Sequence, residues 1–166
     1  MTASIDVNIS VGLGELHVTK DPDAVLICYG LGSCVAVSAF DPVARVGAMA
    51  HIVLPASNNG ANAILPVKFA DRGIPLTVEK MEQAGAQRSR IVIKIAGGAK
   101  MLRGVTAGSV LDIGERNIEA VNVAMHKAGL KIHAQDIRGD WGRCLWLYMA
   151  SGLTRVKTAE QRIIDL

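Results

Sequence analysis

The chain has 166 residues, with 17 glycines, two each of Trp, Tyr and Phe, and a net charge of +3 from 18 basic and 15 acidic side chains. Half of the residues are hydrophobic, which together with the low net charge excludes a disordered chain and predicts a single domain with a buried core. Three cysteines are too few, and odd in number, for a disulfide scaffold. We therefore expect reduced thiols in a cytoplasmic protein.

The sequence shows no transmembrane helix, no signal peptide and no nucleic-acid-binding patch. The longest uncharged apolar stretch, residues 46–56, is shorter than the ~18 residues that a transmembrane helix needs. The N-terminus lacks the basic region and apolar block of a signal peptide. Basic residues are spread along the chain without interleaved aromatics. We therefore expect neither membrane insertion nor nucleic-acid binding.

The first third of the chain is predicted to form strands. Residues 5–11 alternate between apolar and polar, which predicts a half-buried strand ending at Gly12-Leu13-Gly14. Three short apolar runs follow, each closed by glycine, aspartate or proline: residues 24–29, 34–40 and 45–54. Such runs predict adjacent strands of one buried sheet.

A polar loop at residues 56–62 separates these strands from a helical pattern. Apolar and small residues recur at helical spacing over residues 69–81, and the pattern stops near Gly85. Pro75 interrupts it, because a proline inside a helix removes a backbone donor. The sequence therefore predicts a break or a new first turn at that residue.

The second half of the chain combines one more helix with further strands. An amphipathic pattern over residues 118–128 predicts a helix ended by Gly129. Apolar segments predict two single strands and a hairpin around Ser151-Gly152: residues 91–96, 130–137, 144–149 and 153–157. A chain made mostly of strands with two central helices predicts one layered domain of the α/β or α+β class over residues 1–166.

The sequence contains no motif for a cofactor or a metal. Gly30-Leu31-Gly32 is not a dinucleotide fingerprint, because Val35 stands where the third glycine belongs and no long helical pattern follows. Residues 97–100 lack the spacing of a P-loop. The four histidines are scattered, and no Cys-x-x-Cys or His-x-x-x-His pair occurs. We expect neither a cofactor nor a metal ion.

Cys34 is the first candidate for chemistry. It follows Gly30-Leu31-Gly32-Ser33, where two glycines permit a tight turn that directs successive amide N–H groups into one concavity. N–H groups near Gly32, Ser33 and Cys34 would stabilise a thiolate or the oxyanion of an attacked carbonyl. Cys34 is either a nucleophile in such a loop or a small buried hydrophobe after a turn.

His51 is the second candidate. It interrupts an apolar strand, where a lone histidine is either a satisfied core residue or a functional one. A short turn at Asp41-Pro42 separates its strand from that of Cys34. An antiparallel pair would bring the imidazole back towards Cys34, and a thiol–imidazole pair activates cysteine at neutral pH.

The other candidates carry weaker signals. Cys28, at the end of the preceding strand, and Cys144, beside Trp146, are both predicted to be core residues. A polar loop from Gly139 to Arg143 either borders a pocket or is a simple turn.

Several ordered motifs resemble the chemoreceptor glutamine deamidase family, CheD. The resemblance runs from about residue 11 to 157, and residues 158–166 are a C-terminal tail beyond it. The motifs are Gly30-Leu31-Gly32-Ser33-Cys34-Val35-Ala36-Val37, Asp41-Pro42, Gly47-Ala48-Met49-Ala50-His51-Ile52-Val53-Leu54-Pro55, Phe69-Ala70-Asp71, Lys94-Ile95-Ala96-Gly97-Gly98-Ala99, Ile113-Gly114-Glu115-Arg116-Asn117 and Asp136-x-x-Gly139-x-x-x-Arg143.

The resemblance implies a layered α/β fold related to the catalytic domains of deamidating bacterial cytotoxins. It implies hydrolysis of selected glutamine side chains on chemoreceptor cytoplasmic helices to glutamate and ammonia, with glutamate methyl esters as further substrates. Carried over by position, Cys34 is the nucleophile and His51 the general base. The family also binds a CheC-type phosphatase. We expect a monomer.

One position departs from the family pattern. Family members commonly place a threonine, taken as the third catalytic residue, six residues before the cysteine, and here that position is Cys28. A thiol is a weak donor and acceptor, so a backbone carbonyl, water or Ser33 would orient His51 instead. The substitution also supports an alternative function, a weakly active or non-catalytic module that binds CheC or receptor helices.

Overall fold

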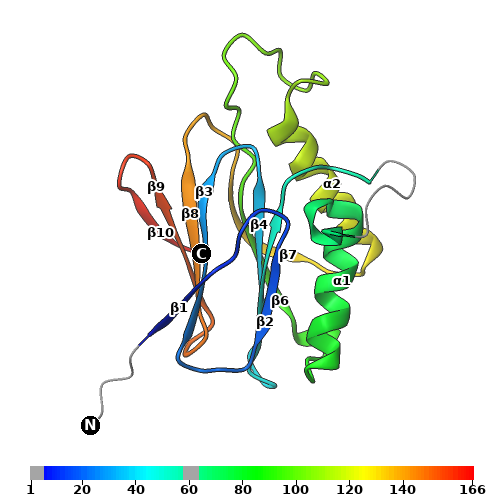
Figure 1. The fold of residues 1–166 in the computed structure, drawn as a ribbon, viewed down its shortest axis with the longest axis vertical. Helices are drawn as coiled ribbons and strands as arrows, with labels where there is room; N and C mark the ends of the chain where they lie inside the picture. The colour runs from blue at the N-terminus through cyan, green and yellow to red at the C-terminus, as the bar shows by residue number, and fades with distance from the viewer. Residues whose placement is uncertain (1–5, 58–63) are drawn as a thin grey trace.

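Two five-stranded β-sheets pack face to face, and both helices lie on the outer side of one of them (Figure 1). This arrangement comes from a computed structural model, which describes residues 6–57 and 64–166. The fold is of the α+β class in three layers, as predicted. Neither described helix is long and apolar enough to cross a membrane.

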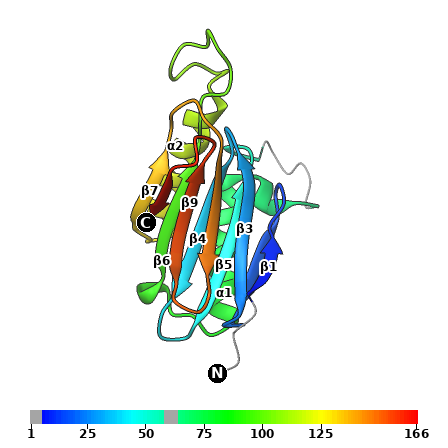
Figure 2. The ribbon, with the colours of Figure 1, turned by 90° about the vertical axis from the view of Figure 1, so that its left-hand side faces the viewer.

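The first sheet, called the open sheet, has its outer face turned away from the helices (Figure 2). Its strands β1 and β3 are parallel and its other neighbours antiparallel. In spatial order the strands are β1 (Val7–Ser10), β3 (Ala24–Leu31), β8 (Arg143–Tyr148), β9 (Leu153–Thr158) and β10 (Ile163–Asp165).

The second sheet, called the covered sheet, lies between the open sheet and the helices (Figure 1). Only its β6–β7 pair is parallel. In spatial order the strands are β2 (Leu16–Thr19), β5 (Val46–Ile52), β4 (Val35–Asp41), β6 (Val92–Gly97) and β7 (Ile132–Ile137). The helices are α1 (Ala70–Gln83) and α2 (Ile113–Lys127), with short 3₁₀ turns η1 (Pro66–Lys68) and η2 (Arg88–Arg90).

Two apolar cores hold the layers together. Every residue of β4 and β5 is buried, because both faces of these central strands are covered. The core between the sheets includes Val11, Leu26, Cys28, Leu31, Ala36, Met49, Ala96, Leu145 and Leu147. The core between the covered sheet and the helices includes Val35, Val37, Ile52, Ile74, Met81, Ile93, Ile95, Ile118 and Val121.

The prediction that the three early apolar runs form one sheet is wrong for the first run. Strands β4 and β5 pair with each other, whereas β3 pairs with β1 and β8 in the open sheet. A continuous apolar run marks a covered strand but does not tell which of two stacked sheets it joins. Residues 32–34 therefore cross from one sheet to the other, which places Cys34 where the two sheets meet.

Helix α1 runs through Pro75 without a break, so the predicted interruption is wrong. A proline removes one backbone donor, here the one that would reach the carbonyl of Asp71, and Pro75 lies on the exposed face. The opposite face, with Ile74 and Met81, packs into the core against the covered sheet. This packing keeps the helix continuous across the missing bond.

Most other predicted elements are confirmed. The strand before Gly97-Gly98, the helix ended by Gly129 and the closing hairpin correspond to β6, α2 and β8–β9. The strand predicted at 5–11 corresponds to β1, but three of its four residues are exposed, so it is not half-buried as predicted, and residue 5 lies outside the described residues. Two strands were not predicted: β2, whose residues are all half-buried, and the short β10 within the expected tail. Of the predicted polar loop, residues 58–62 lie outside the described residues.

Candidate active site

Cys34 and His51 lie on the same face of the covered sheet, His51 within β5 and Cys34 directly before the first residue of β4. His51 of β5 pairs directly with Ala36 of β4, and Cys34 stands two residues before Ala36. Alternate residues of a strand share a face, so all three side chains point towards the open sheet. Cys34 and Ala36 accordingly pack in the core between the sheets. The antiparallel pairing predicted from the Asp41-Pro42 turn is confirmed.

The backbone carbonyl of Val11 orients the His51 ring. Nδ1 of His51 lies 3.2 Å from this oxygen. A carbonyl can only accept a hydrogen bond, so Nδ1 carries the proton and Nε2 carries the lone pair of a neutral imidazole. Nε2 is buried and has no hydrogen-bond partner among the described residues. His51 is therefore oriented by a backbone carbonyl, one of the three groups expected from the sequence beside water and Ser33.

Burial sets the protonation states of both groups. It lowers the pKa of His51 and outweighs the opposite effects of the Val11 carbonyl and Glu15. Burial raises the pKa of the Cys34 thiol, against a smaller lowering by the residue's own backbone N–H. The resting pair near neutral pH is therefore a thiol beside a neutral imidazole. In this state His51 is able to take a proton.

The carbonyl groups of the nucleophile loop, residues 32–34, are held by donors from other elements. The oxygens of Gly32 and Cys34 accept from the backbone N–H groups of Ala99 and Gly98, both at 2.8 Å. The oxygen of Ser33 accepts from Nδ2 of Asn117 at 2.9 Å. Within the described part of the chain, the loop's own N–H groups donate to no other backbone carbonyl. They remain available to an oxyanion.

Two residues outside the predicted site hold this loop in place. Asn117 of α2 is fully buried, and its Nδ2 also donates to the carbonyl of Val53 at 2.9 Å, which links the nucleophile loop to the end of β5. Gly97 has φ +116°, and a Cβ there would lie 2.1 Å from the carbonyl oxygen of Cys34. Both occur in motifs of the sequence resemblance, but no local pattern indicated what they contact.

Comparison with known proteins identifies the family. A protein-family model described as "CheD chemotactic sensory transduction" matches residues 53–158. A protein of Symbiobacterium thermophilum is 48% identical over 150 residues, covering 90% of this chain and 91% of that protein. Proteins of Desulforamulus reducens and Archaeoglobus fulgidus are each 41% identical, covering 90% of this chain and 90% and 92% of theirs. All three are named "Probable chemoreceptor glutamine deamidase CheD".

The chain belongs to the CheD family. The family-model match begins two residues after His51, so it does not by itself assign the roles of Cys34 and His51. Solved structures overlap less well. YfiH of Bacillus licheniformis has a TM-score of 0.42 at 14% identity over 81% of this chain and 60% of that one. The C-terminal domain of CNFy from Yersinia pseudotuberculosis has a TM-score of 0.42 at 6% identity over 96% and 61%.

Cys28 occupies the position where the CheD resemblance leads one to expect threonine. Its side chain is fully buried, and its Sγ lies 3.6 Å from the Val11 carbonyl that also accepts from His51. Burial strongly raises the pKa of this thiol, and the nearby Cys34, Cys144 and Glu15 raise it further. Cys28 is thus a neutral core residue, as predicted, that shares an acceptor with the histidine.

Cys144 is not a core residue, contrary to the prediction. In β8 the inward positions Arg143, Leu145 and Leu147 are buried, and Cys144 alternates with them on the partly exposed outer face of the open sheet. The apolar run was misleading because Trp146 lies on this outer face too, where its ring meets Tyr29 edge-on at 6.4 Å. Aromatic residues on the outer face therefore gave β8 the continuous apolar sequence that is typical of a core strand.

The loop from Gly139 to Arg143 is braced from inside. The buried guanidinium of Arg143 donates to Oδ2 of Asp136 at 3.2 Å and to the carbonyl of Arg138 at 2.6 Å, and stacks over Trp141 at 5.4 Å. Gly139 accepts from the N–H of Lys100 at 2.8 Å and borders a cavity of about 330 Å³. Of the two alternatives for this loop, it borders a pocket.

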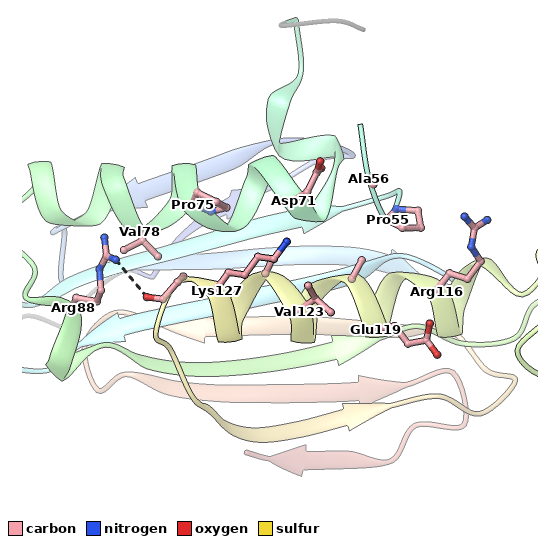
Figure 3. Close-up of a pocket in the computed structure, with 13 residues that line it drawn as sticks. Pro55, Ala56, Asp71, Pro75, Val78, Arg88, Arg116, Glu119, Val123 and Lys127 are labelled. Atoms are coloured by element: carbon pink, nitrogen blue, oxygen red, sulfur yellow. Dashed lines mark hydrogen bonds between the residues drawn. The ribbon is translucent and has the colours of Figure 1, made fainter. Parts of the chain in front are cut away.

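Two further cavities differ in where they lie relative to the nucleophile loop. A small one of about 70 Å³ is bounded by Ser33 of the nucleophile loop and by residues 99–102. Neither Cys34 nor His51 is among the residues that line it. A groove of about 710 Å³ runs between α1 and α2, lined in part by Val78 and Val123, and none of its lining residues belongs to the nucleophile loop (Figure 3). The described residues contain no histidine, cysteine and carboxylate cluster that could hold a metal ion.

Proposed function

We propose that this chain hydrolyses the side-chain amide of selected glutamines on chemoreceptors, with Cys34 as nucleophile and His51 as general base. The names of its CheD relatives supply the substrate class. The observation that carries the proposal is the unpartnered, buried Nε2 of His51, oriented through Nδ1 and on the same sheet face as Cys34. A core histidine with no catalytic use would be expected to have both nitrogens satisfied.

The reaction begins when Nε2 of His51 takes the proton of the Cys34 thiol. The thiolate attacks the carboxamide carbon, and the oxyanion is held by the N–H groups of Gly32, Ser33 and Cys34. His51 returns its proton to the departing nitrogen, so ammonia leaves and a thioester remains. His51 then takes a proton from water, whose oxygen attacks the thioester carbonyl and expels the Cys34 thiolate, leaving glutamate. The thiolate takes the proton back from His51, which restores the thiol. The reaction needs no redox partner.

The same site would also act on a second kind of substrate. A glutamate methyl ester presents the same carbonyl to Cys34, with methanol in place of ammonia as leaving group, so esterase activity is part of the proposal. We propose in addition a monomeric, single-domain enzyme acting in the cytoplasm on receptor helices, with a CheC-type phosphatase as partner. The esterase activity, the receptor substrate and the CheC partner follow from the resemblance, whereas the single domain follows from the chain length and the cytoplasmic location from the few, odd-numbered cysteines. A monomer is the default expectation.

The test is ammonia release from a purified chemoreceptor cytoplasmic fragment, with mass spectrometry of its peptides to locate converted glutamines. A matched fragment with those glutamines replaced by glutamate serves as control. The proposal predicts ammonia in step with the mass change from amide to acid. If the fragment binds but releases no ammonia above the control, the alternative of a non-catalytic binding module is correct.

A further inference from the structure

The segment between β6 and α2, residues 98–112, projects beyond the end of both sheets (Figures 1 and 2). We call it the β6–α2 loop. Four of its apolar side chains are solvent-exposed, with exposed fractions from 53% to 75%: Met101, Leu102, Val110 and Leu111. Exposed apolar residues are normal when scattered singly, but a group of them on one projecting loop marks a contact surface.

This loop is joined directly to the nucleophile loop. Gly98 and Ala99 donate to the carbonyls of Cys34 and Gly32, each at 2.8 Å. The Met101 side chain lies so close to Gly32 that a Cβ there would be 3.0 Å from Cγ of Met101. A protein segment resting on the β6–α2 loop would therefore lie beside Cys34.

The charge of the loop limits what fits it. Residues 98–112 carry Lys100, Arg103 and one acidic residue, Asp112, whose buried side chain accepts hydrogen bonds from the backbone N–H groups of Gly108 and Glu115. An apolar surface flanked by two cations matches a helix that has apolar positions beside acidic ones. A glutamine on such a helix would lie close to the nucleophile loop, because Ser33 of that loop borders one cavity together with Met101 and Leu102.

We propose that the β6–α2 loop is the surface on which a receptor helix docks, with Leu102, Val110 and Leu111 contacting its apolar positions and Arg103 its acidic ones. This inference rests on the proposed function and specifies how that site selects a protein rather than any free glutamine. Binding energy gathered at this loop serves to orient the carboxamide at Cys34.

The test compares the full-length wild-type protein with a triple variant carrying Leu102→Ser, Val110→Ser and Leu111→Ser. The triple variant is expected to lose about tenfold or more in kcat/KM for the receptor fragment, because truncated apolar contacts at an interface centre weaken binding. Its rate of Cys34 alkylation by iodoacetamide, a small carboxamide reagent, is expected to stay within about twofold of wild type. Arg103→Gln is expected to reduce kcat/KM less and to weaken its dependence on salt.

Matched substitutions keep the outcomes distinct. Val43→Ser removes a similarly exposed apolar side chain at the β4–β5 turn and is expected to change nothing. Val123→Ser alters the groove between α1 and α2, and a loss confined to this variant would place docking in that groove and overturn the inference. Wild-type turnover by the triple variant overturns it as well, as does a parallel loss of alkylation, which would show damage to the site itself. Failure of the wild-type protein to release ammonia would instead refute the proposed function.

Discussion

The carbonyl oxygen of Val11 accepts a hydrogen bond from Nδ1 of His51 at 3.2 Å. Val11 is itself fixed, because its N–H donates to the carbonyl of Ile27 at 2.8 Å. The orientation and tautomer of the histidine thus depend on main-chain atoms, which no side-chain substitution deletes. In the proposed mechanism, this contact holds the ring where the family's threonine hydroxyl is replaced by the Cys28 thiol.

The first prediction concerns pH. The proposed mechanism requires neutral His51, and burial lowers the pKa of this group, so its protonation and the expected loss of activity occur below the ordinary value of about 6.5. Burial raises the pKa of the Cys34 thiol, so this thiol stays protonated across the neutral range. As the pH is raised, we expect kcat/KM for the receptor fragment to increase up to a pH below 6.5 and then to stay level to about pH 8. A Cys34 alkylation rate that stays constant down to about pH 4 would instead indicate a preformed thiolate–imidazolium pair.

The second prediction concerns Asn117. Its Nδ2 donates to the carbonyls of Ser33 and Val53, and a carboxylate at this position would face both oxygens without a proton to give. Asn117→Asp is expected to lower the free energy of unfolding by about 2–3 kcal/mol and to reduce turnover by displacing the nucleophile loop. Denaturant unfolding and the ammonia assay measure the two effects. Asn122→Asp, on the exposed face of the same helix, should leave both unchanged; equal behaviour of the two variants would refute the role given to Asn117.

The third prediction concerns Gly97. An alanine there combines φ +116° with a Cβ 2.1 Å from a backbone oxygen, so the Cys34 segment has to move. Gly97→Ala is expected to cost about 3 kcal/mol of stability and most of the activity. Gly129→Ala is the control, because its φ of +69° is unfavourable but a Cβ meets no atom within 4 Å. It should cost about 1 kcal/mol and leave activity intact. A fully active Gly97→Ala protein would contradict the close packing of β6 against the nucleophile loop.

Much of the fold could be predicted from the sequence where local pattern and tertiary context agree. The turn at Asp41-Pro42 between two largely apolar runs is enough to predict an antiparallel pair, and that pair brings His51 near Cys34. The assignment of β3 to the other sheet could not be predicted, because its core residues, such as Leu26, have the same apolar character as those of β4 and β5.

The hydrogen bonds that position the candidate site could not be predicted for a different reason. The contact between Val11 and His51 joins residues 40 positions apart through a main-chain oxygen, and any residue supplies such an oxygen. Asn117 likewise contacts Ser33 across 84 positions, and a single asparagine on a helix gives no signal of its partners. Such contacts depend on how the layers stack, and no spacing in the chain records that stacking.

The central claim is tested most directly by replacing each cysteine in turn and measuring ammonia release from the receptor fragment. Cys34→Ala is expected to lose at least about 10³-fold in kcat, because no other group can form the thioester. Cys28→Ala removes only a shared contact with Val11, and Cys144→Ala changes the outer face of the open sheet, so both should stay within a few-fold of wild type. Wild-type turnover by Cys34→Ala, or a comparable loss in Cys28→Ala while the fold is intact, would contradict the assignment of the nucleophile.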